Sequence, residues 1–331
     1  MIGIYGANGF IGRHLVRRFA DNDRLIRAVS RKFDPVFTAS FANRVEFIEA
    51  DLRQSLEMAS TLQDIDAVIQ LVSTSSPGMK NDHAIADIAE NVVPHVQFLQ
   101  SCIQAGIKRY IFLSSGGTVY GPDAQVPTPE TSLTNPINSH GLTKLIVEKY
   151  IQMHGHVDGL EYIILRVANP FGPGQEFRKG QGLIPAVLDH QRKNLPVKIF
   201  GNGAALRDYL YIDDLIDAIE AAVNLPGAPR LIVNVGSGEV RSVLDVISTI
   251  EATTNQTIKL QYSEARTTDV DIASLDISFA KKVLSWSPKT KFYDGIQLTV
   301  SGTDLGNGAS SHPAPHYKKY TDRHDERLKD T

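Results

Sequence analysis

Short apolar runs alternate with segments of helical periodicity through the first third of the chain. Each run has the length of a buried strand, and together they cover residues 2–5, 25–29, 45–50, 67–72 and 109–113. Between the first two runs, apolar residues recur at helical spacing, and a longer amphipathic segment extends from about 84 to 105. Strands that alternate with helices predict an α/β fold with a doubly wound parallel sheet.

The first apolar run ends in a glycine-rich turn. Gly6, Gly9 and Gly12 have the spacing G-x-x-G-x-x-G between a strand and a helix. Gly6 permits a tight turn, Gly9 lets the backbone approach a pyrophosphate, and Gly12 lets the helix pack closely on the strand. The helix start adds free N–H groups for the phosphates. The pattern predicts a dinucleotide site, and the alternative is an ordinary strand–helix turn.

The end of the second run bears on which dinucleotide binds. Enzymes that prefer NAD usually carry an Asp or Glu about 20 residues past the glycine turn. Here the position holds Ser30, followed by Arg31 and Lys32. The missing carboxylate removes repulsion toward a 2′-phosphate, which Arg31 can pair bidentately. We therefore expect NAD or NADP, with a lean to NADP; a surface Arg–Lys pair is the alternative.

Composition and charge narrow the class of protein. The 331 residues carry a net charge of −3 and no long basic run, so we expect no nucleic-acid partner. Cys102, the one cysteine, fits a reducing compartment and lies in an apolar pattern typical of a packed core thiol. A first strand at residue 2 leaves no room for a signal peptide, and no 18-residue apolar stretch exists. We expect a cytoplasmic protein without membrane insertion and without a metal site.

Further motifs follow in order along the chain. A strand end reads Ser114-Ser115-Gly116-Gly117-Thr118-Val119-Tyr120-Gly121, and a helix that Asn138 or Ser139 caps begins with His140-Gly141-Leu142-Thr143-Lys144. Later segments are Arg166 to Gln175, Ile199 to Gly203, Arg207 to Leu215, Asn234 to Gly238, Arg266 to Val270 and Trp286-Ser287-Pro288. With the glycine turn, these motifs resemble the extended short-chain dehydrogenase/reductases, in the branch of nucleotide-sugar epimerases, dehydratases and reductases. The resemblance spans residues 1 to about 299.

The resemblance implies a Rossmann fold with an interleaved lobe. The dinucleotide-binding domain is expected at 1–169 with a return segment at 201–234, and a smaller α/β substrate lobe at 170–200 and 235–299. We expect residues 300–331 to form a flexible tail because they are polar and lack periodicity. Members of the family commonly pair helices such as 84–105 and 140–154, so we expect a homodimer.

The catalytic positions of the family are changed in this sequence. In the family, a Tyr and a Lys four residues later act beside a Ser or Thr at the fifth strand end; the Tyr exchanges a sugar hydroxyl proton while nicotinamide exchanges hydride. Lys144 is the lysine here, but His140 takes the tyrosine position and Gly116 the Ser/Thr position. We expect Ser115 or Thr118 to supply the missing hydroxyl. Three interpretations of His140 are open. It is a general base with a pKa of about 6.5, it marks an enzyme of weakened activity, or it is a structural residue at the start of a helix.

The resemblance also implies the ligand contacts. Arg207 and Arg266 fall where the family clamps a nucleoside diphosphate, for which guanidinium groups are suited. The expected nucleotide-sugar contacts are Asn169, Leu183, Phe200, Arg207, Tyr209, Arg266 and Asp269. The expected dinucleotide contacts are Gly6, Asn8, Gly9, Phe10, Ile11, Gly12, Arg31, Asp51, Leu52, Leu71, Ser73, Asn91 and Lys144.

Together these expectations point to hydride chemistry at C4 of a nucleotide-activated hexose. A UDP-sugar 4-epimerase acting through a transient 4-keto intermediate leads, and an NADPH-dependent reductase of a 4-keto-6-deoxyhexose nucleotide is the alternative. A 4,6-dehydratase is disfavoured because Gly116-Gly117-Thr118 lacks the acidic pair of that subgroup. The changed catalytic positions keep a third possibility open, a catalytically weakened protein that binds the nucleotide sugar or the cofactor.

Overall fold

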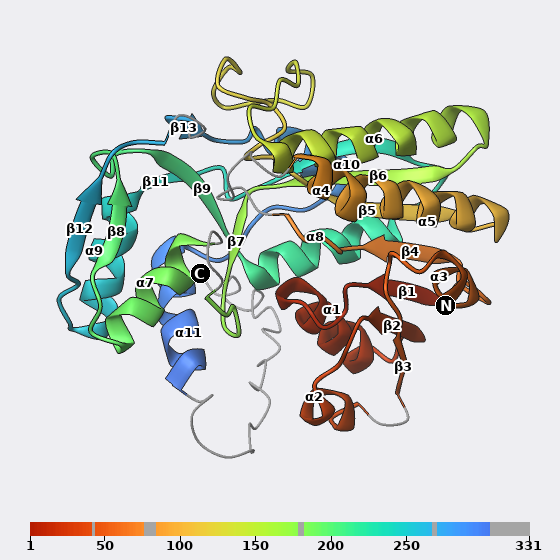
Figure 1. Cartoon of the computed structure of the whole chain (residues 1–331), viewed down its shortest axis with the longest axis horizontal. Coiled ribbons are helices and arrows are strands. Elements are labelled where there is room, and N and C mark those ends of the chain that lie inside the picture. Colours follow the sequence, from red (N-terminus) through yellow and green to blue (C-terminus); the bar gives the residue numbers. More distant parts are fainter. Residues whose placement is uncertain (42–43, 76–83, 178–181, 267–269, 305–331) are drawn as a thin grey trace, which may run out of the picture.

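A seven-stranded parallel sheet is the centre of the fold (Figure 1). The computed structural model describes residues 1–41, 44–75, 84–177, 182–266 and 270–304. The strand order is β10-β6-β5-β4-β1-β2-β3, so the order reverses beside β1, which pairs with both β2 and β4. The strands are β1 (Ile2–Tyr5), β2 (Ile26–Ser30), β3 (Val45–Glu49), β4 (Ala67–Gln70), β5 (Arg109–Ser115), β6 (Glu161–Val167) and β10 (Arg230–Val235). The predicted doubly wound sheet is confirmed, and such a reversal point is where α/β sheets bind ligands.

Helices cover both faces of this sheet. On β5, Ile111 packs in the apolar cluster that includes residues of α1 (Phe10–Asp21) and α8 (Ile212–Asn224). Its neighbours Tyr110 and Phe112 pack in a second cluster, with residues of α5 (Val93–Gln104) and α6 (Ser139–Val157). Alternate residues of one strand therefore face opposite helical layers. Cys102 is fully buried in the second cluster, as expected of a core thiol. Short helices α2 (Pro35–Ala39) and α3 (Ser55–Ser60) follow β2 and β3.

The predicted amphipathic segment from 84 to 105 is helical with one irregular turn. It consists of α4 (Ala84–Asp87), a π-helix (Ile88–Val92) and α5. Pro94 lies in the first turn of α5, where it has no N–H to donate and its ring crowds the preceding turn. A local widening of the helix relieves this conflict, and Asn91 lies in the widened turn. Within the described ranges, every helix is too short or too polar to cross a membrane.

Smaller sheets make up the second part of the fold. Strands β7 (Asn169–Phe171), β9 (Leu206–Tyr211), β11 (Val240–Ser242) and β13 (Ile272–Ala273) form one sheet, and β8 (Val197–Phe200) pairs with β12 (Leu260–Ser263). The helices here are α7 (Leu183–Arg192), α9 (Val243–Thr254) and α11 (Phe292–Asp304), whereas α10 (Ser278–Leu284) contacts α8 and β10 of the large sheet. Figure 1 shows this part beside the large sheet, with β7 and β9 on the side that faces it.

Three details differ from the sequence-based division of the chain. First, α10 falls in the expected substrate lobe 235–299 but contacts α8 and β10 of the large sheet. β9 falls in the expected return segment 201–234, yet it pairs with β7, β11 and β13 and not with the seven-stranded sheet. Only α8 and β10 of that segment return to the large sheet. Residues 300–304, which were expected in the tail, complete α11, and residues 305–331 lie outside the described residues. The division into a dinucleotide domain and a substrate lobe otherwise stays a prediction.

Candidate active site

The glycine turn brings the start of α1 against β1. Gly6 has a φ of +89°, which favours glycine, and a Cβ at Gly12 would lie 2.4 Å from the Gly6 carbonyl oxygen. Helix and strand therefore approach as closely as the sequence pattern predicts. Gly9 is the N-cap of α1, and no side chain caps the helix. The first amides of α1 are thus left for an anionic ligand.

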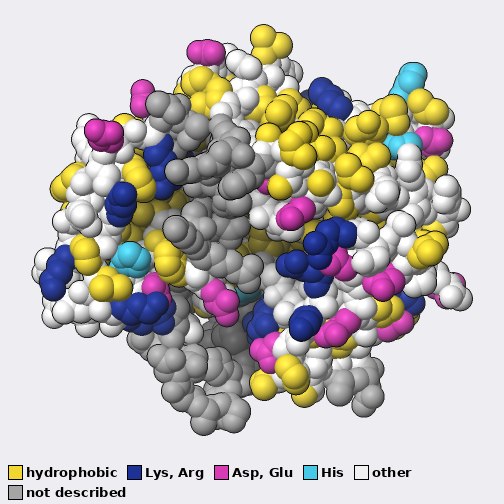
Figure 2. Space-filling model, viewed as in Figure 1, with side chains coloured by type: hydrophobic (Ala, Val, Ile, Leu, Met, Phe, Trp, Pro, Cys, Tyr) yellow, Lys and Arg dark blue, Asp and Glu magenta, His cyan; other side chains and the backbone are white. Residues whose placement is uncertain are grey.

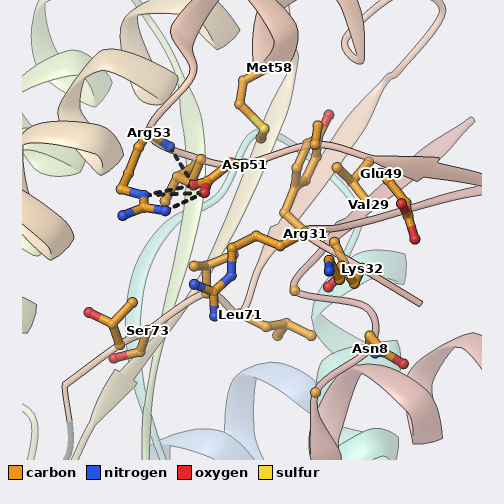
Figure 3. Close-up of a pocket in the computed structure, with 18 of the residues that line it drawn as sticks. Asn8, Val29, Arg31, Lys32, Glu49, Asp51, Arg53, Met58, Leu71 and Ser73 are labelled. Carbon is orange, nitrogen blue, oxygen red and sulfur yellow. Dashed lines mark hydrogen bonds and ion pairs between the residues drawn. The ribbon is translucent and has the colours of Figure 1, made fainter. Parts of the chain in front are cut away.

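A first cavity of about 690 Å³ lies beside this turn, over the ends of β1 to β4 (Figure 3). Of the predicted dinucleotide contacts, it brings together Gly6, Asn8, Gly9, Arg31, Asp51, Leu52, Leu71 and Ser73. Its volume fits an extended nucleotide, and the glycine turn in its lining offers backbone groups to such a ligand. Asn91 does not line it. The Asn91 side chain accepts a hydrogen bond from the Thr74 N–H at 2.9 Å, so it supports the loop after β4 from behind.

Among the described residues, three basic side chains line the first cavity, and one of them, Arg53, forms an ion pair. Arg53, which sequence reasoning missed, donates hydrogen bonds to Asp51 from Nη2 to Oδ2 at 2.6 Å and from Nε to Oδ1 at 3.1 Å. This hydrogen bonding holds the pKa of Asp51 below its usual value. Arg31 and Lys32 have no ion pair within the described ranges. Figure 3 shows the Arg31 guanidinium extended into the cavity near Leu71. Arg31 is close enough to Asp51 to help lower the pKa of that carboxyl, but neither it nor Lys32 is held in a salt bridge by a described residue, so both can turn to a ligand's phosphate.

A second cavity of about 520 Å³ continues from the first. The two share Gly6, Asn8, Gly9, Leu71 and Ser73. The second adds Phe10, Ile11 and Gly12 from the glycine turn and, on its far side, Ser75, Ser115, His140 and Lys144. A dinucleotide that spans both cavities would place one end beside the candidate catalytic residues.

The start of α6 positions those residues. Asn138 caps the helix by accepting a hydrogen bond from Gly141 N–H at 2.8 Å, as one of the two predicted caps. A Cβ at Gly141 would lie 2.5 Å from the Thr118 carbonyl oxygen, so glycine lets the helix start against the turn after β5. Lys144, one turn along, donates a hydrogen bond from Nζ to the Leu113 carbonyl oxygen at 2.8 Å.

The two ionisable groups are both shifted toward neutrality. Burial lowers the pKa of Lys144 to about 8. Burial and then the nearby Lys144 charge lower the pKa of His140 to about 3. His140 Nδ1 lies 2.9 Å from the Ser75 hydroxyl oxygen, and Nε2 has no hydrogen-bond partner among the described residues. At neutral pH the site therefore holds a neutral imidazole beside an ammonium group.

Ser115 and Thr118, in the segment at the end of β5, both line a third cavity, but only Ser115 of the two also lines the second. A Cβ at Gly116 would lie 2.5 Å from Leu275 Cδ1, so a larger residue there would meet the side chain of Leu275. Ser115 lines the second cavity with His140 and Lys144. Thr118 is buried, its Oγ1 has no partner in the described part of the chain, and it lines a third cavity. Ser115 is thus the hydroxyl that shares a cavity with His140.

The third cavity, of about 270 Å³, adjoins the second. It brings together the predicted nucleotide-sugar contacts Asn169, Leu183, Phe200, Arg207, Tyr209 and Arg266. The Arg266 guanidinium lies 3.6 Å from the centre of the Phe200 ring. Asp269 lies outside the described residues. The two cavities share Ser115, Asn169, Pro170, Gln175, Gly182 and Pro185.

Gln175 is a residue of this junction that sequence reasoning did not single out. Its Nε2 donates to the Pro170 carbonyl oxygen at 3.1 Å, whereas its buried Oε1 has no partner in the described ranges. An unpaired amide oxygen at the meeting point of two cavities is available to a ligand hydroxyl. The only sequence signal was its place at the end of the Arg166 to Gln175 motif.

Known proteins match nearly the whole chain. The family model described as the NAD dependent epimerase/dehydratase family matches residues 2–236. The dTDP-4-dehydro-6-deoxyglucose reductase of Escherichia coli is 31% identical over 303 residues, 90% of this chain and 95% of that protein. The UDP-glucose 4-epimerase of Mycolicibacterium smegmatis is 28% identical, over 90% of this chain and 96% of that protein.

Solved structures agree in fold. The UDP-glucose 4-epimerase of Thermotoga maritima, solved with UDP-glucose, has a TM-score of 0.84 and 28% identity, and the match covers 91% of this chain and 97% of that one. A further structure, solved with UDP-glucuronic acid and NAD, has a TM-score of 0.85 at 26% identity, with 92% of this chain and 99% of that one covered. The resemblance read from the motifs is confirmed, and the chain belongs to the NAD dependent epimerase/dehydratase family of enzymes.

Proposed function

We propose that this enzyme oxidises or reduces C4 of a nucleotide-activated hexose, with a UDP-sugar 4-epimerase as the leading candidate. The observation that carries the proposal is the junction between the second and third cavities. There, Ser115, Asn169 and Gln175 line both the cavity of His140 and Lys144 and the cavity of Arg207 and Arg266. A sugar at the junction would lie between the catalytic residues and a bound diphosphate.

The residues divide the work of the reaction. A bound nicotinamide dinucleotide supplies the hydride acceptor for a sugar alcohol or the donor for a sugar ketone. Arg207 and Arg266 offset the charge of the diphosphate, and Phe200 offers an apolar surface next to them. Lys144 places a positive charge beside the reacting oxygen, where negative charge develops. His140 and Ser115 supply hydrogen bonds to the same oxygen.

The second candidate is an NADPH-dependent reductase of a 4-keto-6-deoxyhexose nucleotide. Arg31 and Lys32 favour it because they are unpaired cations in the first cavity, and the strand end carries Ser30 in place of a carboxylate. A 2′-phosphate would find two positive charges there and no carboxylate at position 30. An epimerase regenerates its cofactor in each turnover and gains nothing from choosing the phosphorylated form.

Turnover with defined substrates tests both candidates. The purified enzyme would be incubated with UDP-glucose or UDP-galactose and NAD, and separately with a 4-keto-6-deoxyhexose nucleotide and NADPH. Formation of the 4-epimer without net cofactor consumption identifies an epimerase, and oxidation of one NADPH per sugar identifies a reductase. Binding of both ligands with turnover of neither would leave the third possibility, a weakened nucleotide-sugar and cofactor-binding protein.

We also propose that the chain pairs with a second copy through α4, α5 and α6. These helices lie side by side. The exposed apolar residues on them, and on the π-helix between α4 and α5, are Ile85, Ile88, Val93, Leu142, Tyr150, Met153 and Val157. Figure 2 shows hydrophobic side chains gathered over this part of the surface. We expect light scattering to give a dimer mass, and Met153→Asp to give a monomer. Leu298→Asp, at a similarly exposed apolar residue of α11, is the matched control.

We propose a cytoplasmic location for the protein, because its single cysteine, Cys102, is a buried free thiol that suits a reducing compartment.

A further inference from the structure

Glu148 is a buried acid on α6, one helical turn beyond Lys144. Residues four apart lie on the same face of a helix, and both of these side chains reach the end of β5. Lys144 Nζ donates a hydrogen bond to the Leu113 carbonyl oxygen at 2.8 Å, and the carboxylate of Glu148 accepts one from the hydroxyl group of the next residue, Ser114. The acid and the lysine are therefore neighbours on the helix and at the strand. None of the motifs read from the sequence includes Glu148.

A salt bridge joins Glu148 to Arg166, on β6. Arg166 Nη2 lies 2.7 Å from Glu148 Oε2, and Nε lies 3.2 Å from Oε1. The exposed fractions are 0% for Glu148 and 2% for Arg166, so the pair is shielded from water. Ser114 and Arg166 are cross-strand neighbours, so the carboxylate binds both strands at one level of the sheet. Because a guanidinium keeps its charge at every ordinary pH, the carboxylate that pairs with it is ionised.

The Lys144 ammonium group has no salt-bridge partner of its own among the described residues. It lies 4.8 Å from the centre of the Phe112 ring and 2.8 Å from the Leu113 carbonyl oxygen. Both groups attract a cation, but neither carries a full negative charge. Burial lowers the pKa of Lys144 to about 8, because the charged form loses its hydration. A nearby anion is therefore needed to offset the cost of burial.

The groups around Lys144 include few possible anions. The charged or titratable residues that the surrounding elements bring near this part of α6, within the described ranges, are His140 and Glu148 of α6, His95 of α5, Arg166 of β6, Asp87 of α4 and Glu90 of the π-helix. Burial and then the Lys144 charge lower the pKa of His95 to about 4 and that of His140 to about 3. Both rings are therefore neutral at ordinary pH.

Of the three acids in this set, Glu148 is the one that acts on Lys144. Asp87 accepts a hydrogen bond from Ser139 at the start of α6, and Glu90 lines the first cavity. The pKa of Lys144 has two causes, burial, which lowers it, and the Glu148 charge, which raises it. Glu148 therefore supplies the anion that the buried ammonium group needs.

We propose that Glu148 is a positioning residue for the reaction, whose buried negative charge holds the Lys144 side chain in its ammonium form at the end of β5. The inference rests on the proposed function for the use of that ammonium group beside the C4 oxygen. Arg166 and Ser114 fix the carboxylate, and the carboxylate in turn fixes the charge of Lys144. Removal of the carboxylate would leave two buried cations, Lys144 and Arg166, on neighbouring elements. Lys144 would then lose its proton at a lower pH.

Nuclear magnetic resonance on protein labelled with ¹³C at the lysine Cε atoms tests the proposal without substrate. Lys144→Met identifies the Lys144 signal by its loss, and the position of that signal against pH gives the pKa of Lys144. We expect Glu148→Gln to lower this pKa by about one unit or more, as for the loss of a nearby opposite charge. An unchanged or raised pKa in Glu148→Gln would overturn the proposal.

The double substitution of Glu148→Gln and Arg166→Met separates the charge effect from damage to the fold. Glu148→Gln alone leaves Arg166 buried without a carboxylate, which costs stability, whereas a neutral pair of similar size removes that penalty. We expect the double variant to unfold closer to the parent than Glu148→Gln does, yet to keep a Lys144 pKa below that of the parent. Recovery of the parent pKa would show that Glu148 acts on the two strands alone. The double variant also carries the test if Glu148→Gln does not fold.

Glu161→Gln is the matched control, because Glu161 also pairs with an arginine between β5 and β6. Arg109 Nη2 lies 2.9 Å from Glu161 Oε2, and the two residues are cross-strand neighbours at the opposite end of these strands. The loss of this pair should cost some stability and leave the pKa of Lys144 at the parent value. A shift as large as that in Glu148→Gln would contradict an effect of the local charge.

The rate against pH gives the second readout. If the pKa of Lys144 falls from about 8 to about 7, Glu148→Gln should lose about threefold in kcat near about pH 7.5 and little below about pH 6, because the ammonium fraction follows the pKa. An alkaline limb at the parent position, despite a lowered pKa, would overturn the link to the reaction. Absence of turnover in the parent would count against the proposed function, and the magnetic resonance result would still decide whether Glu148 holds the charge of Lys144.

Discussion

The first cavity takes its lining from residues 5 to 90, at consecutive strand ends of one sheet, whereas the third collects its lining from 115 to 270, across smaller sheets and loops. The first rests on backbone amides and the close approach that Gly12 permits. The third rests on long side chains, above all Arg207 and Arg266. We therefore expect substitutions in the glycine turn of the first cavity to act through the fold, and substitutions of side chains in either cavity to act on one ligand.

Gly12→Val should have the largest effect, because it acts on the backbone of the first cavity. The added Cβ would lie 2.4 Å from the Gly6 carbonyl oxygen and 2.7 Å from Ala7 Cα, so α1 must move away from β1. We expect the free energy of unfolding to fall by about 3 kcal/mol or more, and dinucleotide binding to be lost as well. Thermal unfolding and calorimetry measure the two. Gly117→Ala, where an added Cβ meets nothing within 4 Å, should unfold like the parent.

His140→Ala, in the second cavity between the two regions, should come next. Loss of a positioned acid, base or donor costs about 10²–10⁴ in turnover. Because the pKa of His140 is lowered to about 3, the rate should show no acid limb near about 6.5 that comes from this ring. His140→Tyr separates a weakened natural enzyme from a site rebuilt around imidazole. Activity well above the parent would mean a weakened natural enzyme, and activity as low as that of Ala would mean a site rebuilt around imidazole.

Arg207→Ala should weaken only the third cavity. We expect nucleotide-sugar binding to lose about 2–5 kcal/mol, as for a truncated charge partner, while dinucleotide binding stays near the parent value. Calorimetry with each ligand alone makes the measurement. Arg241→Ala is the control, since Arg241 is the cross-strand neighbour of Arg207 but does not line the third cavity. Equal losses for both ligands would show that Arg207 supports the fold.

Ser30→Asp should change only the choice of dinucleotide in the first cavity. A carboxylate would repel a 2′-phosphate and accept from a ribose hydroxyl, so the preference should move toward NAD by about 1–3 kcal/mol. Ser30→Asn, of similar size without the charge, should move it much less. Dissociation constants for NAD and NADP in the three proteins give the ratio. A constant ratio would remove position 30 from cofactor selection.

The pH dependence of turnover should show the smallest change. If the ammonium form of Lys144 is required, activity should halve as the pH rises to its pKa of about 8 and fall further above it. The ammonium form approaches completion only about two pH units below that pKa. Rates measured between neutral and alkaline pH test this. Lys149→Met, an exposed lysine of the same helix, should keep the alkaline limb.

The sequence predicted the first cavity better than the third for a physical reason. Glycine spacing and strand ends are local patterns, and parallel strand ends meet at one edge, so Gly6, Arg31 and Asp51 could be grouped in advance. Arg207 and Phe200 were grouped only through the family resemblance, because no local pattern brings their strands together. The same limit explains why β9 was assigned to the return segment: an apolar run does not show which sheet it joins.

The residues that were missed depend on contacts between distant segments. Ser75 meets His140 across 65 positions of sequence, and nothing near either residue predicts the pair. The sequence likewise could not predict that Gly116 lies against Leu275, because Leu275 comes from a distant loop. Asn91 accepts a hydrogen bond from the Thr74 N–H out of the widened helical turn, which the sequence did not show, and its contact with the dinucleotide stays a prediction.

Transfer of deuterium from sugar to cofactor tests the central claim most directly. The enzyme would be mixed with a UDP-hexose that carries deuterium at C4 and with NAD or NADP, and the nicotinamide would be analysed by mass spectrometry after rapid quenching. The account predicts deuterium on the nicotinamide ring, because the junction of the cavities brings C4 to the dinucleotide. Deuterium that stays wholly at C4 while calorimetry shows both ligands bound would contradict it.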